Sequence, residues 1–375
     1  MSLLPVQGTH LPRRALLGAG LAALPCMQAF GDIPGLAAWA AERSLLLGTM
    51  VTLQQIQNSP ELVDRVRTDA GLIVPGLEMK WSHLHPAPDR FDFTDADLMV
   101  AFAAAERKKI RGHTLIWHEA LPKGFDLGSD AADARKVVSG HIRAVCGRYA
   151  GRMHSWDVVN EPIYPAHQRP GALRASPFYR ALGPDYIRMA LEWAAEADPT
   201  ARLVINDYNV EQSDADQEAR RVAILELLNS LARRGAPLHA LGIQGHLGPR
   251  MAPFDPDRLR RFIRDVAGLG LDVYVTELDI VDLRLPTDIV TRDAEVAAML
   301  RAFLQVVLSE PSVTMVNFWG LGDVHSWMNF NTSTRRSDGL PARGHLYDDS
   351  WQRKPAWNAV AAALRDTPIA ARTAP

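Results

Sequence analysis

Residues 153–159, Met-His-Ser-Trp-Asp-Val-Val, form the stretch that decides the fold. The run is short and ends in β-branched residues, which is typical of a buried strand. A helical pattern opened by Pro184 follows at Asp185–Ala197, and a second apolar run lies at Leu203–Asn206. A strand, a helix and a strand of these lengths predict a βαβ unit, in which the two strands are parallel.

The same alternation extends from this unit in both directions along the chain. We expect eight strands, at Leu45–Met50, Leu72–Pro75, Ile110–Ile116, Met153–Val159, Leu203–Asn206, Ala240–Gln244, Leu271–Thr276 and Thr314–Phe318. Eight such units predict an α/β protein with a closed (β/α)8 TIM barrel. No linker rich in Ser, Gly or Pro interrupts residues 41–368, so we expect a single catalytic domain there. A doubly wound sheet would need a phosphate-binding loop, and none is convincing.

One helix illustrates how the predicted helices are bounded. It starts at Thr94 and ends near the basic residues 108–109, where the negative end of the helix dipole favours positive charge. Its apolar stripe consists of Leu98, Phe102 and Ala105. We expect these three side chains to form its buried face.

Composition and charge exclude several classes of protein. The 375 residues include 41 Lys and Arg against 43 Asp and Glu, a net charge of -2, so we expect no binding of nucleic acid. With 47% hydrophobic residues the chain is unlike a disordered interaction protein. Its two cysteines, Cys26 and Cys146, are too few for a disulfide framework or a cysteine zinc cluster, and Cys146 is expected to be a buried apolar side chain.

The N-terminal residues resemble an export signal. The pair Arg13-Arg14 precedes an apolar run, Ala15–Leu24, which is too short to span a membrane as a helix. Paired arginines before a short apolar stretch fit a bacterial twin-arginine signal within residues 1–30. We therefore expect an exported protein, periplasmic or secreted, with no membrane span. A frayed N-terminal helix of a cytoplasmic protein is the open alternative.

Several short motifs point to other chemistry but are incomplete. His118-Glu119 starts like a zinc protease helix, yet Pro122 follows and no second histidine is correctly spaced. His83 and His85 could chelate a metal, but such pairs are more often surface or hydrogen-bonding histidines. The glycines at 320 and 322 lack the third glycine of a nucleotide loop. We expect neither a metal nor another cofactor.

Two glutamates close predicted strands of the barrel. Glu161 follows Met153–Val159, and Glu277 follows Leu271–Thr276. Each alone could simply end a strand or cap a helix. Together, at the carboxyl ends of barrel strands, they match the carboxyl pair that cleaves a glycosidic bond, one protonated and one ionised. Because Asn160 and Glu161 are successive, the strand must bulge or break there if both face the site.

Seven ordered segments make the chain resemble glycoside hydrolase family 10, the retaining endo-β-1,4-xylanases. They are Glu78–Trp81, Arg111–His118, Trp156–Pro162, Ile205–Asn209, Gly242–His246, Thr276–Asp279, and Phe318–Gly320 with Trp327. The resemblance spans roughly residues 45 to 360. It implies hydrolysis of xylan-type β-glycosidic bonds through a covalent glycosyl-enzyme.

The same resemblance implies the roles of individual residues. Glu161 would be the acid/base and must hold a proton in the free enzyme, while Glu277 would be the nucleophile. Asn160 would bind the sugar hydroxyl beside the scissile carbon, and His246 would bond Glu277 with Asp279 behind it. The pocket would be lined by Lys80, His113, Trp117, Tyr208, Gln244, Trp319 and Trp327. The partner would be a polysaccharide or oligosaccharide, and we expect a monomer.

Three departures from the family pattern affect the second sugar on the non-reducing side. Gly76-Leu77 and Ala120 stand where the family has Glu-Asn and Gln, so three hydrogen-bonding side chains are replaced. We expect an atypical second glycone subsite. A retaining hydrolase of a substituted oligosaccharide or a glycosylated small molecule stays open, as does a non-catalytic carbohydrate-binding barrel.

Overall fold

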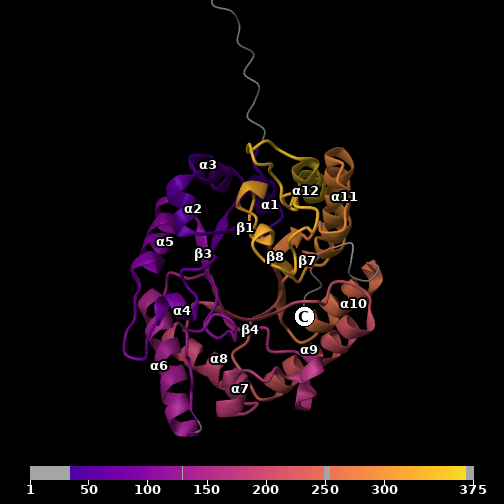
Figure 1. The fold of residues 1–375 in the computed structure, drawn as a ribbon. Coiled ribbons are helices and arrows are strands. Elements are labelled where there is room, and N and C mark those ends of the chain that lie inside the picture. Colours follow the sequence, from indigo (N-terminus) through magenta and orange to yellow (C-terminus); the bar gives the residue numbers. More distant parts are fainter. Residues whose placement is uncertain (1–33, 129, 249–253, 369–375) are drawn as a thin grey trace, which may run out of the picture. The chain divides into compact units, whose positions relative to one another are not determined.

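A closed ring of parallel strands forms the centre of the structure, a computed structural model that describes residues 34–128, 130–248 and 254–368 (Figure 1). Neighbouring strands follow the order β6-β5-β4-β3-β2-β1-β9-β8-β7, and pairing of β6 with β8 closes the ring. The strands are β1 (Leu46–Val51), β2 (Leu72–Pro75), β3 (Lys109–Gly112), β4 (Ser155–Asn160), β5 (Arg202–Asp207), β6 (Ala240–Ile243), β7 (His246–Leu247), β8 (Asp272–Ile280) and β9 (Val313–Phe318). The predicted (β/α)8 barrel is confirmed.

Helices surround the ring (Figure 1). They are α1 (Leu36–Glu42), α2 (Leu53–Asn58), α3 (Pro60–Asp69), α4 (Trp81–Leu84), α5 (Thr94–Ala105), α6 (Ala131–Tyr149), α7 (Pro177–Leu182), α8 (Tyr186–Ala197), α9 (Ala215–Arg233), α10 (Pro256–Ala267), α11 (Ile289–Val307) and α12 (Pro355–Asp366). Short 3-10 turns, η1 (Pro165–His167), η2 (Pro170–Ala172), η3 (Asp323–His325) and η4 (Trp327–Asn329), lie in the segments after β4 and β9.

All eight predicted strands are present, but three details differ. β3 ends at Gly112, four residues early, and pairing with the next strand resumes only at Ile116, opposite Val159. β8 continues beyond Thr276 to Ile280, so Glu277 lies inside the strand rather than after it. The two-residue strand β7 pairs with the extended end of β8 and was not predicted.

Of the apolar stripe predicted for α5, only Phe102 packs against the core, where it is half-buried. Leu98 is 46% exposed and Ala105 is also exposed, whereas the buried residues are Ala96, Met99, Val100 and Ala103. The apolar residues of α5 lie on most sides of the helix, so their spacing in the sequence does not indicate which side is buried.

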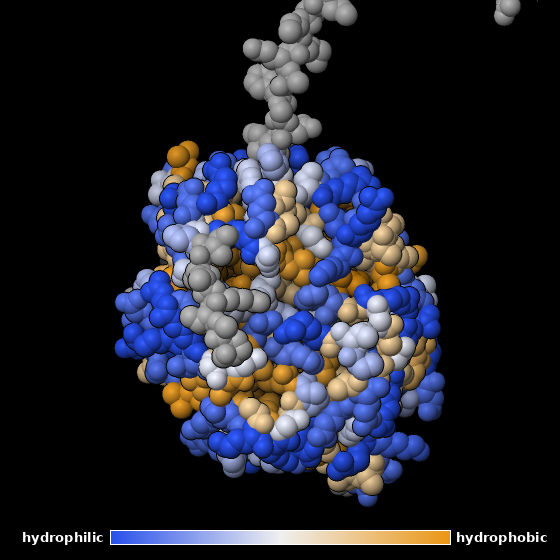
Figure 2. All heavy atoms as spheres, turned by 180° about the vertical axis from the view of Figure 1, so that it is seen from behind, coloured by the Kyte–Doolittle hydropathy of each residue, from blue (hydrophilic) through white to orange (hydrophobic). Residues whose placement is uncertain are grey.

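Two apolar layers fill the fold. The larger lies between the strands and the helices and includes Cys146, which is fully buried as expected. The smaller contains Met50, Tyr274, Met315 and Trp319. On the face opposite to that of Figure 1, hydrophilic residues cover most of the surface and hydrophobic ones show only in patches (Figure 2).

Export and domain limits stay predictions. The expected signal, residues 1–30, lies outside the residues that the structure describes. Among the described helices, none combines the length and apolarity that crossing a membrane requires.

Candidate active site

The backbone of β4 breaks its regular course where the first glutamate emerges. Pairing with β5 shifts register between Asp157 and Val159, and Glu161 has a left-handed φ of 56°. This conformation is uncommon for residues other than glycine, and functional sites are among the places where it occurs. The predicted irregularity is therefore present, and it lets Asn160 and Glu161 contribute to one site.

Glu277 is held by a donor on each carboxylate oxygen. Asn206 Nδ2 donates to Oε1 at 2.8 Å, and His246 Nε2 donates to Oε2 at 3.1 Å. The residue is 4% exposed. Burial alone would raise its pKa, but the His246 hydrogen bond, the charges of His113 and His246 and the Asn206 bond outweigh burial and lower the pKa of Glu277 to about 2. Glu277 is thus ionised at any working pH.

A chain of polar contacts supports the histidine beside Glu277. His246 Nδ1 donates to Asp279 Oδ1 at 2.8 Å, and Trp327 Nε1 donates to Asp279 Oδ2 at 2.6 Å. Burial opposes charge on His246, but Asp279 and Glu277 prevail and raise the pKa of the imidazole well above its usual value. The ring is therefore an imidazolium that donates from both nitrogens.

Asn206 links the two glutamates, although sequence reasoning did not single it out as a site residue. Its amide nitrogen donates to Asn160 Oδ1 at 2.8 Å as well as to Glu277. Its own oxygen accepts from Thr276 at 2.6 Å. Gly242 provides the space, because a Cβ there would lie 2.3 Å from Asn206 Oδ1. An asparagine that ends a strand gives no sequence signal for this role beyond its place in a matching segment.

The contacts of the Glu161 carboxylate are longer than those of Glu277. Gln244 Nε2 donates to Oε1 at 3.2 Å, and Asn160 Nδ2 donates to the same oxygen at 3.4 Å. The other oxygen faces the guanidinium of Arg174, whose Nη2 is 3.7 Å away. Tyr208 lies on this side, since its hydroxyl accepts from Arg174 Nη2 at 3.0 Å. Arg174 is a second residue that the sequence did not reveal.

A lysine and a tryptophan form a further part of the lining. Lys80 is held close to both glutamates: burial lowers the pKa of its amine, while Glu277, Glu161 and other carboxylates partly restore it. Its Nζ lies 5.0 Å from the centre of the Trp117 ring, within the range of a cation–π contact.

His113 occupies the bottom of the same region. Its Nδ1 donates to Asp157 Oδ2 at 2.9 Å, and Asp157 also pairs with Arg111. The His113 ring meets Trp319 edge-on at 5.2 Å and Trp117 at 6.1 Å. With these contacts, all twelve site residues predicted from the sequence fall into one connected group.

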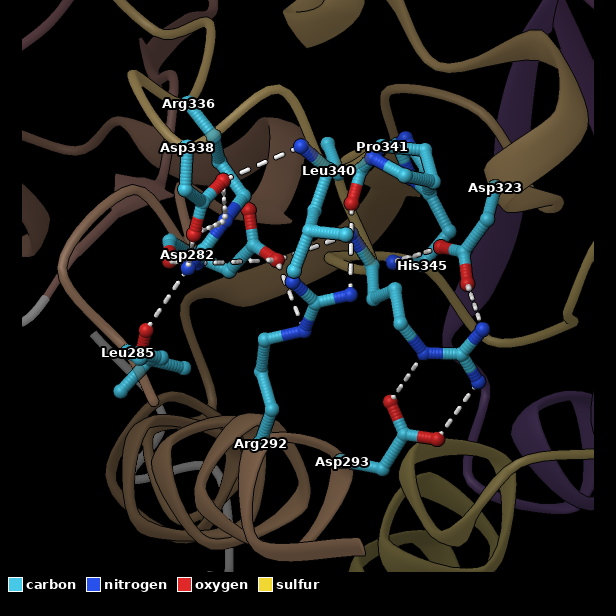
Figure 3. Close-up of polar contacts among 12 residues, drawn as sticks. Asp282, Leu285, Arg292, Asp293, Asp323, Arg336, Asp338, Leu340, Pro341 and His345 are labelled. Atoms are coloured by element: carbon cyan, nitrogen blue, oxygen red, sulfur yellow. Dashed lines mark hydrogen bonds and ion pairs between the residues drawn. The ribbon is translucent and has the colours of Figure 1, made fainter. Parts of the chain in front are cut away.

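A buried charge network joins the segment after β9 to α11 and to the segment after β8 (Figure 3). Arg343 donates to both carboxylate oxygens of Asp293 on α11, at 2.9 and 2.7 Å. Arg336 donates to the backbone oxygens of Asp282 and Leu285, at 2.6 and 3.0 Å. The network therefore fixes the segment that follows β9.

His345 connects this network to the tryptophan beside the site. Its backbone N–H donates to Asp323 Oδ1 at 3.1 Å, and its Nε2 lies 3.0 Å from Oγ of Ser326, the residue before Trp327. Burial lowers the pKa of His345 to about 4, so the ring is neutral at neutral pH. The turn that presents Trp327 is thus supported by a neutral histidine and a buried carboxylate.

The histidines considered as metal ligands make other contacts. His83 is exposed on α4, whereas His85 is buried, with Nε2 2.9 Å from the backbone oxygen of Pro88 and Nδ1 3.3 Å from His141. Among the residues that the structure describes, no group of three or more His, Cys, Asp and Glu side chains could hold a metal ion.

Comparison with known proteins places this site in a family. The sequence profile of glycosyl hydrolase family 10 matches residues 35–363. Endo-1,4-beta-xylanase B of Thermotoga neapolitana is 29% identical over 341 residues, 89% of this chain and 93% of that protein. A beta-1,4-xylanase of Dictyoglomus thermophilum is 36% identical over 277 residues, 71% of this chain and 75% of that protein.

Solved structures agree with the sequence comparison. The crystal structure of xylanase 10B from Thermotoga maritima superposes with a TM-score of 0.79 at 29% identity, covering 88% of this chain and 98% of that one. Xylanase 10B from Thermotoga petrophila RKU-1, in complex with xylobiose, gives the same TM-score and identity over 88% of this chain and 97% of that one. The chain therefore belongs to glycosyl hydrolase family 10.

Proposed function

We propose that this protein is a retaining endo-1,4-β-xylanase with an atypical second glycone subsite. The main support for this proposal is the contrast between the two glutamates, which are connected through Asn206 and Asn160. Glu277 is fixed as an anion by His246 and Asn206, while Glu161 meets only longer contacts. Cleavage with retention needs this division between a permanent nucleophile and a group that changes its protonation.

In the first step, a Glu277 carboxylate oxygen forms a bond to the anomeric carbon of the sugar. The bond from that carbon to the leaving oxygen breaks, and Glu161 gives its proton to that oxygen. In the second step, Glu161 takes a proton from water as the water oxygen attacks the same carbon. The bond to Glu277 then breaks, and the sugar leaves with its original configuration.

The second glycone position is supported as atypical by the packing around Gly76. A Cβ at Gly76 would lie 2.6 Å from Met50 Sδ, so the methionine fills the space in front of this glycine. Leu77 is 45% exposed. Its backbone N–H donates to Glu78 Oε2 at 3.2 Å, and Leu53 N–H donates to Glu78 Oε1 at 2.6 Å, so this adjacent acid is already engaged.

We infer that apolar side chains occupy the region where the family binds a sugar hydroxyl. Met50 belongs to the same apolar cluster as Trp319, which extends this apolar region toward the catalytic pocket. Each hydrogen bond contributes about 0.5–1.5 kcal/mol to binding. Without these groups, kcat/KM for an unsubstituted substrate should be lower by about tenfold or more. An acylated sugar residue would instead place its apolar group against Leu77 and Met50.

Product-resolved kinetics on linear xylotetraose and on O-acetylated xylo-oligosaccharides test this proposal. We expect the acetylated substrates to be preferred. Leu77→Asn with Ala120→Gln should improve linear xylotetraose about tenfold, by restoring two polar groups without touching Gly76. Adding Gly76→Glu requires the Met50 side chain to move, because a Cβ at position 76 would lie 2.6 Å from its Sδ, so we expect the largest gain together with Met50→Ala.

The single change Met50→Ala is the matched control, since it opens space without adding a polar group. Fast turnover of linear xylotetraose by the wild type, unchanged in the double variant, would contradict the atypical subsite. The exposed Glu119 would then be the carboxylate to test as a substitute ligand.

We also propose export through the twin-arginine route, on the basis of Arg13, Arg14 and the apolar run that follows them. Replacing both arginines with lysine should retain the protein inside the cell. Unchanged export of that variant would contradict the twin-arginine proposal.

A further inference from the structure

The segment between β4 and α7 folds back on itself and returns a cation to the glutamate that starts it. Ile163 pairs with Leu173 in an antiparallel bridge, and the backbone N–H of Arg174 donates to the oxygen of Pro162 at 2.7 Å. Arg174 is thereby placed beside Glu161, thirteen residues earlier, and is 7% exposed.

Arg174 contacts both the backbone and the side chain of Glu161. Its Nε donates to the Glu161 backbone oxygen at 2.7 Å, and its Nη2 lies 3.7 Å from Oε2. The guanidinium also packs over the Tyr164 ring at 4.6 Å and donates to the Tyr208 hydroxyl at 3.0 Å. A side chain held at this many points is a fixed charge.

The two oxygens of Glu161 therefore have different roles. Oε1 accepts from Gln244 and Asn160, so the catalytic proton belongs on Oε2. The distance of 3.7 Å from Nη2 to Oε2 is too long for a hydrogen bond and short enough for a strong charge interaction. The oxygen that releases the proton is thus the oxygen that faces the cation.

Resting on the proposed function, we propose that Arg174 is a positioning residue that makes Glu161 release its proton readily and holds its backbone in the left-handed conformation. The cation stabilises the carboxylate that appears when the proton moves to the leaving group. It makes Glu161 a stronger acid in the first step, and it fixes the direction of Oε2.

Other charged groups also face Glu161 and must be considered. Lys80, just before α4, adds a second positive charge. Burial raises the pKa of Asp207, at the end of β5, to about 7, so this carboxyl adds a negative charge only as the pH approaches and passes neutrality. Tyr208 follows Asp207 and is neutral. Of the charged side chains near Glu161 in the described part of the chain, Arg174 is the one that also bonds its backbone.

The test is the pH dependence of kcat/KM for Arg174→Met and Arg174→Lys, measured with xylotetraose and with an aryl xylobioside whose leaving group needs no protonation. We expect the basic limb of the xylotetraose profile to move to higher pH by about one unit in Arg174→Met. At the wild-type optimum, xylotetraose should lose about tenfold in kcat/KM, and the aryl substrate should change much less.

Arg174→Lys keeps the charge but cannot make the forked contacts, so it should restore the basic limb while recovering only part of the rate. Arg180→Met is the matched control, because Arg180 lies nearby on α7 and donates only to the backbone oxygen of Ala175. It should leave both profiles unchanged.

Thermal unfolding of each variant separates a loss of fold from a change of chemistry. An unmoved basic limb in folded Arg174→Met, or equal losses on both substrates, would overturn the inference while leaving the xylanase proposal intact. Absence of retaining xylan hydrolysis by the wild type would instead overturn the proposed function.

Discussion

The two glutamates of the site are built in opposite ways. Glu277 lies inside a strand, with a short contact on each oxygen and a supporting chain of His246, Asp279 and Trp327. Glu161 lies just after a strand, in a left-handed conformation, with contacts of 3.2 Å or more to its carboxylate.

This difference follows from what each group must do. A nucleophile that stays ionised gains from fixed donors in a buried setting, which need no rearrangement during the reaction. An acid that gives up and regains a proton would be held in one state by equally strong donors. Short hydrogen bonds to the carboxylate are therefore concentrated on Glu277, and the carboxylate of Glu161 is left with longer contacts.

Removal of Glu277 should have the largest effect. Glu277→Ala deletes the proposed nucleophile, so kcat should fall by about 10⁴-fold or more on every substrate. Added azide should restore a product of inverted configuration. Retained turnover with normal stereochemistry would assign the nucleophile to another residue.

Removal of Glu161 should depend on the substrate. Glu161→Ala should lower kcat/KM on xylotetraose by about 10² to 10⁴-fold, because the leaving oxygen is no longer protonated. Formation of the glycosyl-enzyme from a dinitrophenyl glycoside should be nearly normal in a pre-steady-state burst. Equal losses on both substrates would remove the distinction between the two carboxyls.

Removing the imidazolium that donates to Glu277 should raise the pKa of this carboxyl. Without the imidazolium, burial raises the pKa of Glu277, and a protonated carboxyl cannot attack. In His246→Asn the acid limb of the kcat/KM profile should therefore move to higher pH, by about one to two units. Gln244→Ala serves as the comparison, since it removes a side-chain contact to Glu161 and should leave the acid limb in place.

The smallest effect concerns stability at low pH. The pKa of His345 is about 4 in the folded chain and 6.5 in the reference state, so the unfolded chain binds the proton first as the pH falls from 6.5 to 4. Stability contributed by the neutral ring is present above pH 6.5 and is lost across this interval, at most about 3 kcal/mol. In urea unfolding, His345→Gln should therefore lose less free energy of unfolding between pH 7 and pH 4.5 than the wild type does. An equal loss in both proteins would show that other groups dominate the pH dependence.

The sequence predicted the barrel because short β-rich runs alternate with helical patterns, and it predicted both glutamates because each comes within two residues of the β-branched end of a predicted strand. It failed where no pattern exists to read. The Ala-rich helix α5 has no preferred apolar face, and the two-residue strand β7 is too short for a periodic signal.

Contacts between distant segments were also missed. Arg174 lies in an irregular segment, and only the folded hairpin brings it to Glu161. Met50, in β1, and Gly76, the residue after the neighbouring strand β2, fit together through size alone. Such partners carry no spacing signal, because neither residue type suggests the other.

The most direct test of the central claim is the anomeric configuration of the first product, followed by proton NMR during hydrolysis of xylotetraose. Attack by Glu277 and then by water inverts the anomeric carbon twice, so the β-anomer should form first and the α-anomer only later by mutarotation. Initial appearance of the α-anomer would mean a single displacement by water, and would contradict a nucleophilic Glu277.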